Sequence, residues 1–157
     1  MRAIGIDPGA KGAIALFIGG VFELVQDMPT VDDKGRPRVD AAALATLVRS
    51  LAPDRATLER VGAMPGQGVT SMFQFGRSVG IVEGVLAALQ IPVSYVTPVQ
   101  WKGALHVPKD KGGARLRASQ LIPAAAHCWP RSKDDGRAEA SLIALFAIQV
   151  EEQSISW

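Results

Sequence analysis

The sequence predicts a mixed α/β domain in which helices cover a central sheet. Its 157 residues are the length of one typical domain, and 48% of them are hydrophobic. That content is enough for a substantial buried core without disulfides. Short apolar segments separated by glycine turns open the chain, and helical patterns then alternate with further strands. This order is typical of a layered α/β domain whose sheet begins as an antiparallel meander.

The first strands are expected at Arg2–Asp7, Ala13–Ile18 and Val21–Gln26, because each segment is short, apolar and bounded by turn residues. Gly19–Gly20 is a two-residue turn of the kind that joins antiparallel strands. These segments therefore predict a three-stranded meander. The next segment, Met28–Val39, combines charges of both signs with glycine and proline, so we expect an exposed loop there.

Helices and strands alternate after this loop. Asp40 is expected to cap a helix that runs to Leu51. A long helix is expected from about Thr70 to Gln90, since its apolar residues recur every three or four positions. The last helix is apolar on nearly every side after Glu139, which is typical of a buried helix. The remaining expected elements are strands at Ala56–Val61 and Pro92–Val96 and helices at Pro98–Leu105, Arg115–Leu121 and Asp135–Val150.

Composition excludes several classes of protein. Cys128 is the single cysteine, which excludes a disulfide framework, and only His106 and His127 could join it in a zinc site. No apolar run reaches the ~20 residues needed to cross a bilayer. The N-terminal segment carries an acid and a turn where a signal peptide needs its apolar stretch. We therefore expect a soluble protein of a reducing cytoplasm that does not associate with a membrane.

Charge is unevenly distributed along the chain, although the net charge is only +2. The segment from Trp101 to Arg137 holds eight Lys and Arg residues but only three Asp residues. A basic segment on a mildly acidic body is typical of a surface that binds a polyanion such as nucleic acid. The alternative is a solvated loop rich in Lys and Arg, and charge alone favours neither interpretation.

Several acids lie where the pattern predicts burial. Asp7 ends a buried strand, Glu59 lies inside the fourth strand, and Glu139 lies inside an apolar run. Asp135 precedes Glu139 by one helical turn, and Asp134 is its neighbour. A buried ionised carboxylate is costly unless it is paired or bound to a metal. Because the ligands would be oxygens only, the sequence favours Mg²⁺ or Mn²⁺ over zinc.

Each acid also has a purely structural interpretation. The Asp-Pro-Gly turn explains Asp7, and Glu59 could face solvent from an edge strand. Asp135 could cap the last helix, with Glu139 in its first turn stabilised by the helix dipole. These explanations would have to hold together in three separate segments, which favours a shared site without removing the structural alternative.

Four segments carry a resemblance to a known family. They are IGIDPGAKGAIALF at Ile4–Phe17, LERV at Leu58–Val61, PVQWK at Pro98–Lys102 and DDGRAEASLIALFA at Asp134–Ala147. In this order and spacing they resemble the RuvC family of Holliday-junction resolvases, within the RNase H-like superfamily, and most of all its compact bacteriophage members. The resemblance implies one nuclease domain over residues 1–157. Its sheet would have five strands, the first three antiparallel, flanked by helices.

The resemblance implies that Asp7, Glu59 and Glu139 are catalytic and bind metal. The family's remaining acid lies three residues before the last one, and here that position is Gly136. We therefore assign Asp135 as the fourth catalytic acid and metal ligand, with Asp134 as the alternative ligand. The implied reaction is Mg²⁺-dependent nicking of four-way DNA junctions. Two ions, replaceable by Mn²⁺, would act together and leave 5′-phosphate and 3′-hydroxyl ends.

The resemblance also implies contacts with branched DNA. Lys102 falls on a lysine of many family members and is expected at the DNA backbone, although an ordinary surface lysine is the alternative. Further basic residues would widen this contact and make binding salt-dependent. These residues are Lys109, Lys111, Arg115 and Arg117.

A glycine ridge marks the long central helix. Gly76, Gly80 and Gly84 recur every four residues, and each costs about 1 kcal/mol relative to Ala inside a helix. Close packing of another backbone would recover that cost. The protein's own sheet could supply this backbone, whereas the resemblance implies that the ridge lies in a homodimer interface.

The sequence also fits other functions. Many relatives carry an aromatic wedge after the fourth-strand Glu, and here Met64 or Phe73 would have to take that role. A related nuclease acting on flaps, forks or RNA, or a junction-binding module without catalysis, would fit the same residues. An ATP-binding protein of the actin or hexokinase type would need over twice this length. If the chain is phage-encoded, its expected location is the host cytoplasm.

Overall fold

The computed structural model describes residues 1–62, 66 and 68–154. A five-stranded sheet lies at its centre, in the order β3-β2-β1-β6-β7. β2 pairs antiparallel with both β1 and β3, whereas β6 runs parallel to β1 and β7 runs parallel to β6. The predicted mixed sheet with an antiparallel meander is therefore confirmed. Its strands are β1 (Arg2–Asp7), β2 (Ala13–Ile18), β3 (Val21–Asp27), β6 (Arg55–Glu59) and β7 (Val93–Val96).

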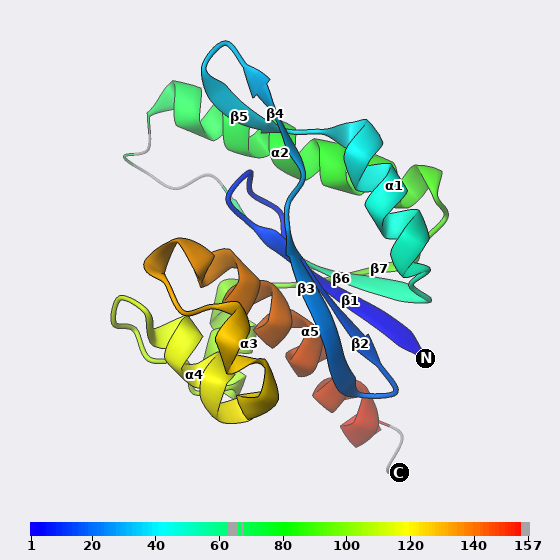
Figure 1. The fold of residues 1–157 in the computed structure, drawn as a ribbon, viewed down its shortest axis with the longest axis vertical. Coiled ribbons are helices and arrows are strands. Elements are labelled where there is room, and N and C mark those ends of the chain that lie inside the picture. Colours follow the sequence, from blue (N-terminus) through cyan, green and yellow to red (C-terminus); the bar gives the residue numbers. More distant parts are fainter. Residues whose placement is uncertain (63–65, 67, 155–157) are drawn as a thin grey trace.

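Helices cover both faces of the sheet (Figure 1). One face packs against α1 (Ala41–Leu51) and α2 (Val69–Ala88), and these elements share one apolar core. The opposite face packs against α3 (Pro98–Ala104), α4 (Gly113–Leu121) and α5 (Asp135–Ser154), which share a second core. We call these the α2 core and the α5 core. Two-residue alternation along each strand supplies side chains to both.

The α5 helix crosses directly over the middle of the sheet. At Gly5 in β1, an added Cβ would collide with the backbone of Ala140 and Ala144. Glycine at this position therefore lets helix and strand approach more closely than any side chain would allow. The helix is buried along most of its length as far as Ile148, which confirms the prediction from its apolar pattern.

The segment Met28–Val39 is a β-hairpin, so the prediction of an irregular loop there is wrong. Its strands are β4 (Thr30–Asp33) and β5 (Arg36–Val39). Lys34 and Gly35 form the turn, both at positive φ (55° and 80°). Two residues of this conformation match the twist of a hairpin. The strands are mostly exposed, so their charges hid the pairing from a pattern based on apolar alternation.

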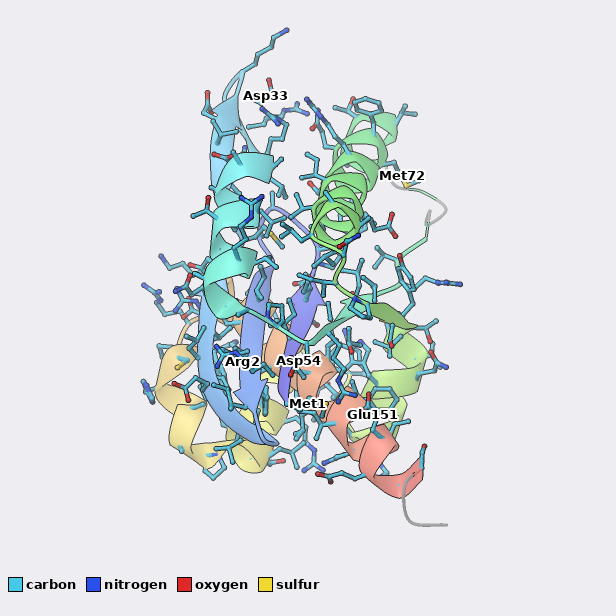
Figure 2. All side chains as sticks on the ribbon, turned by 90° about the vertical axis from the view of Figure 1, so that its right-hand side faces the viewer. Met1, Arg2, Asp33, Asp54, Met72 and Glu151 are labelled. Atoms are coloured by element: carbon cyan, nitrogen blue, oxygen red, sulfur yellow. The ribbon has the colours of Figure 1, made fainter. Side chains whose placement is uncertain are left out.

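Two contacts fix the hairpin to the body. Val39 at its base is fully buried in the α2 core. Asp33 accepts a hydrogen bond from Arg77 of α2 at 2.9 Å. Figure 2 shows Asp33 at the outer end of the hairpin, across from the half of α2 that carries Met72. Arg2 and Asp54, joined by a 2.6 Å hydrogen bond, lie at the other end of the sheet.

Smaller differences concern the second half of the chain. β6 begins at Arg55 and ends at Glu59, so it is shifted from the predicted strand, and α4 begins at Gly113. Two short 3₁₀ helices, Pro123–Cys128 and Ser132–Asp134, precede α5 and have no counterpart in the prediction. No helix within the described residues is long and apolar enough to cross a membrane.

Candidate functional site

Two acids meet where neighbouring parallel strands end. Ile6 of β1 pairs with Leu58 of β6, so Asp7 and Glu59 occupy the next position on each strand. Ile6 and Leu58 point into the α2 core, and alternation therefore turns both acids toward the α5 face. The carboxyl ends of parallel strands are where α/β sheets commonly place ligand-binding groups.

Glu139 in the first turns of α5 completes a group of three acids. The pKa of the Asp7 carboxyl rises from 3.8 to about 7, first through burial and then through the negative charges of Glu139 and Glu59. The backbone N–H of Gly9 and the charge of Lys102 act in the opposite direction. The structure thus brings together Asp7, Glu59 and Glu139 from three distant segments, and their charges are incompletely compensated.

Glu59 is held by a tryptophan that the sequence analysis did not assign to the site. The indole Nε1–H of Trp101 donates to Glu59 Oε1 at 2.8 Å. Glu59 is 7% exposed, and Trp101 is completely buried. Burial raises the pKa of Glu59, while the hydrogen bond from Trp101 opposes that rise. A buried indole N–H needs an acceptor, and this requirement was the available signal in the PVQWK segment.

Lys102, the next residue of α3, contacts a different acid. Its Nζ donates to Glu139 Oε1 at 2.9 Å, and it also lies 4.9 Å from the centre of the Trp101 ring. Its side chain is 41% exposed. The lysine expected at the DNA backbone therefore partly neutralises the acidic group in this structure.

Asp134 and Asp135 each have an arginine partner. Asp134 is nearly buried and accepts hydrogen bonds from the side chain and the backbone N–H of Arg131. The Arg131 hydrogen bonds lower the pKa of Asp134 to about 2. Asp135 is 45% exposed and accepts from Arg115 Nε at 2.6 Å. Of the two, Asp135 shares a cavity of about 600 Å³ with Glu139.

Gly136 occupies the position where the resemblance in sequence implied an acid, and the packing leaves no room for a side chain there. An added Cβ would lie 2.9 Å from Gly12 Cα and 3.2 Å from Asp7 Oδ2, and would collide with the Lys11 carbonyl. At this position α5 therefore touches the β1–β2 turn through bare backbone. A ligand at this position would require the helix to move away from Asp7.

The donor chemistry of the acidic group suits a hard divalent cation. Asp7, Glu59 and Glu139 offer carboxylate oxygens only, which Mg²⁺ and Mn²⁺ prefer. Within the described part of the chain, however, no three His, Cys, Asp or Glu side chains are close enough together to enclose an ion. Trp101 and Lys102 each engage one oxygen of an acid in this arrangement.

The predicted DNA-binding residues divide into two kinds. Lys109 and Lys111 are exposed on the segment between α3 and α4, and Lys109 lines the same cavity as Glu139. Arg115 is bonded to Asp135, and Arg117 donates to the Leu105 carbonyl at 2.6 Å. Among the described residues the two lysines have no hydrogen-bond or ion-pair partner, whereas the two arginines already make contacts within the protein.

Of the two residues that could take the role of the aromatic wedge, the structure describes one. Phe73 lies on α2 with 66% of its surface exposed. Met64 lies outside the described residues.

Comparison with solved structures identifies the architecture. The chain superposes on Thermus thermophilus RuvC, solved in complex with a Holliday junction substrate, with a TM-score of 0.71 and 19% sequence identity. The match covers 98% of this chain and 96% of that one. The chain has the RuvC fold. The RNase H-like architecture implied by the sequence motifs is thereby confirmed.

The chain also superposes on one yeast protein and one viral protein. The yeast mitochondrial Holliday junction resolvase Ydc2 matches with a TM-score of 0.63 and 16% identity, over 99% of this chain and 80% of Ydc2. The fowlpox virus Holliday junction resolvase matches with a TM-score of 0.56 and 15% identity, over 96% and 99%. No protein-family model matches the chain, and no curated protein matches it.

Proposed function

We propose that this protein is a metal-dependent endonuclease that resolves Holliday junctions by paired nicks. The observation that carries the proposal is the convergence of Asp7, Glu59 and Glu139 at one edge of a RuvC-like sheet. A carboxyl whose pKa is raised to about 7 by burial and by other acids is poorly suited to a structural role. Strongly perturbed acids of this kind cluster at functional sites. We take residues 1–157 to form one nuclease domain.

The three acids would hold divalent cations, with Asp135 as the fourth candidate ligand. Such ions, when bound, activate a water molecule and stabilise the leaving 3′ oxygen of a phosphodiester, giving 5′-phosphate and 3′-hydroxyl ends. The acids orient the reacting groups from three rigid elements, β1, β6 and α5. Without a cation their combined negative charge would repel a DNA phosphate. Mn²⁺ would be able to replace Mg²⁺ because it prefers the same ligands.

Four-way DNA is the proposed substrate, bound in the cytoplasm, which is the host cytoplasm if the chain is phage-encoded. Lys109 is exposed and lines the cavity that holds Glu139, and Lys111 is exposed and lines a cavity that holds Asp135, so both would contact the backbone of the strand to be cut. Lys102 would exchange its bond with Glu139 for a phosphate when a cation neutralises that acid. Binding should weaken steeply with salt, because each phosphate contact releases counterions.

The proposed assembly is a homodimer formed through α2. Gly76, Gly80 and Gly84 are exposed, and an added Cβ at any of them would meet no atom within 4 Å. The alternative that this ridge packs on the protein's own sheet is therefore wrong. Val69 and Phe73, 86% and 66% exposed, extend the ridge toward the start of the helix. A continuous apolar and glycine-lined stripe of this kind is typical of a protein interface.

A nicking assay on a mobile four-way junction with Mg²⁺ tests the activity. Asp7→Asn and Glu59→Gln should keep junction binding and lose at least ~100-fold in nicking rate, because each removes a metal-binding charge. Glu23→Gln, which alters an exposed carboxylate on β3, is the matched control and should nick normally. Full activity of both site variants would overturn the proposal. Flap, fork and RNA–DNA hybrid substrates in the same assay decide whether four-way junctions are preferred.

One observation favours a second candidate, a junction-binding module without catalysis. Asp134, Asp135 and Glu139 are each paired with a basic side chain, which leaves fewer charges for a cation. This candidate predicts binding to the junction in EDTA and no nicking when Mg²⁺ is added.

A further inference from the structure

Helix α3 presents two consecutive side chains to two different acids. Trp101 donates to Glu59 Oε1, and Lys102 donates to Glu139 Oε1. The lysine is partly exposed and can exchange partners with solvent or phosphate, whereas the tryptophan is completely buried. We propose that Trp101 is a positioning residue, which holds Glu59 through Oε1 and so fixes the direction in which this carboxylate would face a divalent cation. This inference rests on the function proposed above.

The path that joins Trp101 to Glu59 is short and rigid. Val96, the last residue of β7, pairs with Glu59 in the sheet register, and α3 begins two residues later. Thr97 caps this helix: its side chain accepts from the Gln100 backbone N–H at 3.3 Å, and the Gln100 side chain accepts from the Thr97 N–H at 2.8 Å. The reciprocal cap fixes the direction in which α3 leaves the sheet. The indole is therefore placed against Glu59 by the strand next to it.

Packing keeps the indole in that orientation. Trp101 belongs to the α5 core, together with Leu105 of its own segment and Ala118 of α4. A ring enclosed in this way has one rotamer available, so its N–H points to a fixed place. Water has no access to the fully buried ring and could not replace the donor. Without the donor, a nearly buried carboxylate would lose its hydrogen bond and turn more freely about its side-chain torsions.

Residues that hydrogen-bond a metal ligand, without touching the metal themselves, commonly change the metal affinity of a site. A residue that hydrogen-bonds a ligand orients it, and its removal typically costs 10–100-fold in metal affinity. With Oε1 bonded to the indole, the Glu59 carboxylate would meet a cation in one fixed orientation. The expected consequence is a change in metal affinity, with the chemistry at saturating metal largely retained.

The chain provides a matched control for the test. Trp129 is also buried, at 2% exposure, and its Nε1 donates to Ser119 Oγ at 2.9 Å. Replacing it by Phe removes the same N–H group from the same core without touching an acid of the site. Any loss of stability that follows from trimming a buried indole should therefore be similar in both variants.

The first experiment compares Trp101→Phe and Trp129→Phe with the unmodified protein. Calorimetric titration with Mn²⁺ in the absence of DNA should give about 10–100-fold weaker binding for Trp101→Phe only. The Mg²⁺ concentration for half-maximal nicking should rise by a similar factor, while the rate at saturating Mg²⁺ stays close to that of the unmodified protein. Unchanged metal affinity in Trp101→Phe would overturn the role of Trp101, as would an equal loss in both variants.

A second measurement covers the case in which Trp101→Phe does not fold. In ¹⁵N–¹H spectra of the indole groups, Glu59→Gln should move the Trp101 signal, because a charged acceptor becomes neutral, and should leave the Trp129 signal in place. A Trp101 signal that does not move would overturn the proposal. An unmodified protein that binds no Mn²⁺ would overturn the metal-dependent function and this inference together. Normal metal affinity in Trp101→Phe removes only the positioning role.

Discussion

At the scale of single residues, the site combines groups that would be more stable apart. Asp7 is buried near Glu59 and Glu139, and its pKa is raised first by burial and then by the charges of these two acids. Evolution tolerates such unfavourable placements where a function requires them. The acids should therefore reduce the stability of the protein when no cation is bound, and their neutral variants should be more stable.

The stability of Asp7→Asn tests this directly. The folded-state pKa of Asp7, about 7, lies above the unfolded value near 3.8. The native protein thus loses stability as pH rises from about 4 through 7, and the variant escapes that loss. In EDTA at pH 8 the variant should be more stable by roughly 1–3 kcal/mol, since screening by water reduces the full value of the shift. Below pH 4 the two proteins should be equal.

Urea unfolding between pH 4 and 8 gives the measurement, with Glu23→Gln as the control that should match the unmodified protein throughout. A variant less stable than the unmodified protein at pH 8 would show that Asp7 is a structural residue.

At the scale of elements, the start of α5 explains why neighbouring acids differ. Asp134 lies in the 3₁₀ turn before the helix and closes it through the backbone and side chain of Arg131. Gly136 then brings the helix against the β1–β2 turn. One turn later Glu139 reaches the acids of the sheet. Asp134 and Gly136 thus anchor the start of α5, and Glu139, a few residues later, contributes a carboxylate to the site.

Asp134→Asn should therefore affect folding more than catalysis. The lowered pKa of Asp134, about 2, means that its contribution is complete above pH 4 and is lost as pH falls toward 2. At pH 7 the variant should melt a few degrees lower, because it loses a capping contact. Its melting temperature should approach that of the unmodified protein at pH 2, and its nicking at 25 °C should remain. Loss of nicking without loss of stability would instead make Asp134 a metal ligand.

At the scale of the whole molecule, the α2 stripe is the surface that a second copy would cover. A Cβ added at Gly80 meets no atom within 4 Å in the described part of the protomer, yet a side chain there would separate two helices that meet at this ridge. A symmetric dimer places two equal sites on opposite sides of one axis, which suits paired cuts in a four-way junction.

Gly80→Glu should convert a dimer into a folded monomer. The helix itself should not be destabilised, because Glu has a better helix propensity than Gly by several tenths of a kcal/mol. Sedimentation velocity measures the mass, and Ala43→Glu, at an exposed position of α1, is the control. A dimer that survives Gly80→Glu, or an unmodified protein that is monomeric, would contradict the α2 interface.

Sequence patterns found those features that depend on local periodicity. Short apolar segments bounded by turn residues located β1, β2 and β3, the three- and four-residue spacing located α2, and an almost wholly apolar run located α5. The same patterns failed at β4–β5, where the strands are mostly exposed and no apolar side exists to reveal them. Local reasoning also marked Asp7, Glu59 and Glu139 as acids out of place, since their neighbours along the chain are apolar.

The sequence by itself determined the order of the strands and helices, apart from the β4–β5 hairpin and the two short 3₁₀ helices, and the ends of the strands at which acids would lie. Only the tertiary structure decided the partners of three acids: Trp101 for Glu59, Lys102 for Glu139 and Arg115 for Asp135. The physical reason is that a hydrogen bond depends on a few ångströms and on burial. Both are set by packing between segments that lie far apart in the chain. Glu59 and Trp101, for example, are 40 residues or more apart. No local sequence pattern encodes such packing.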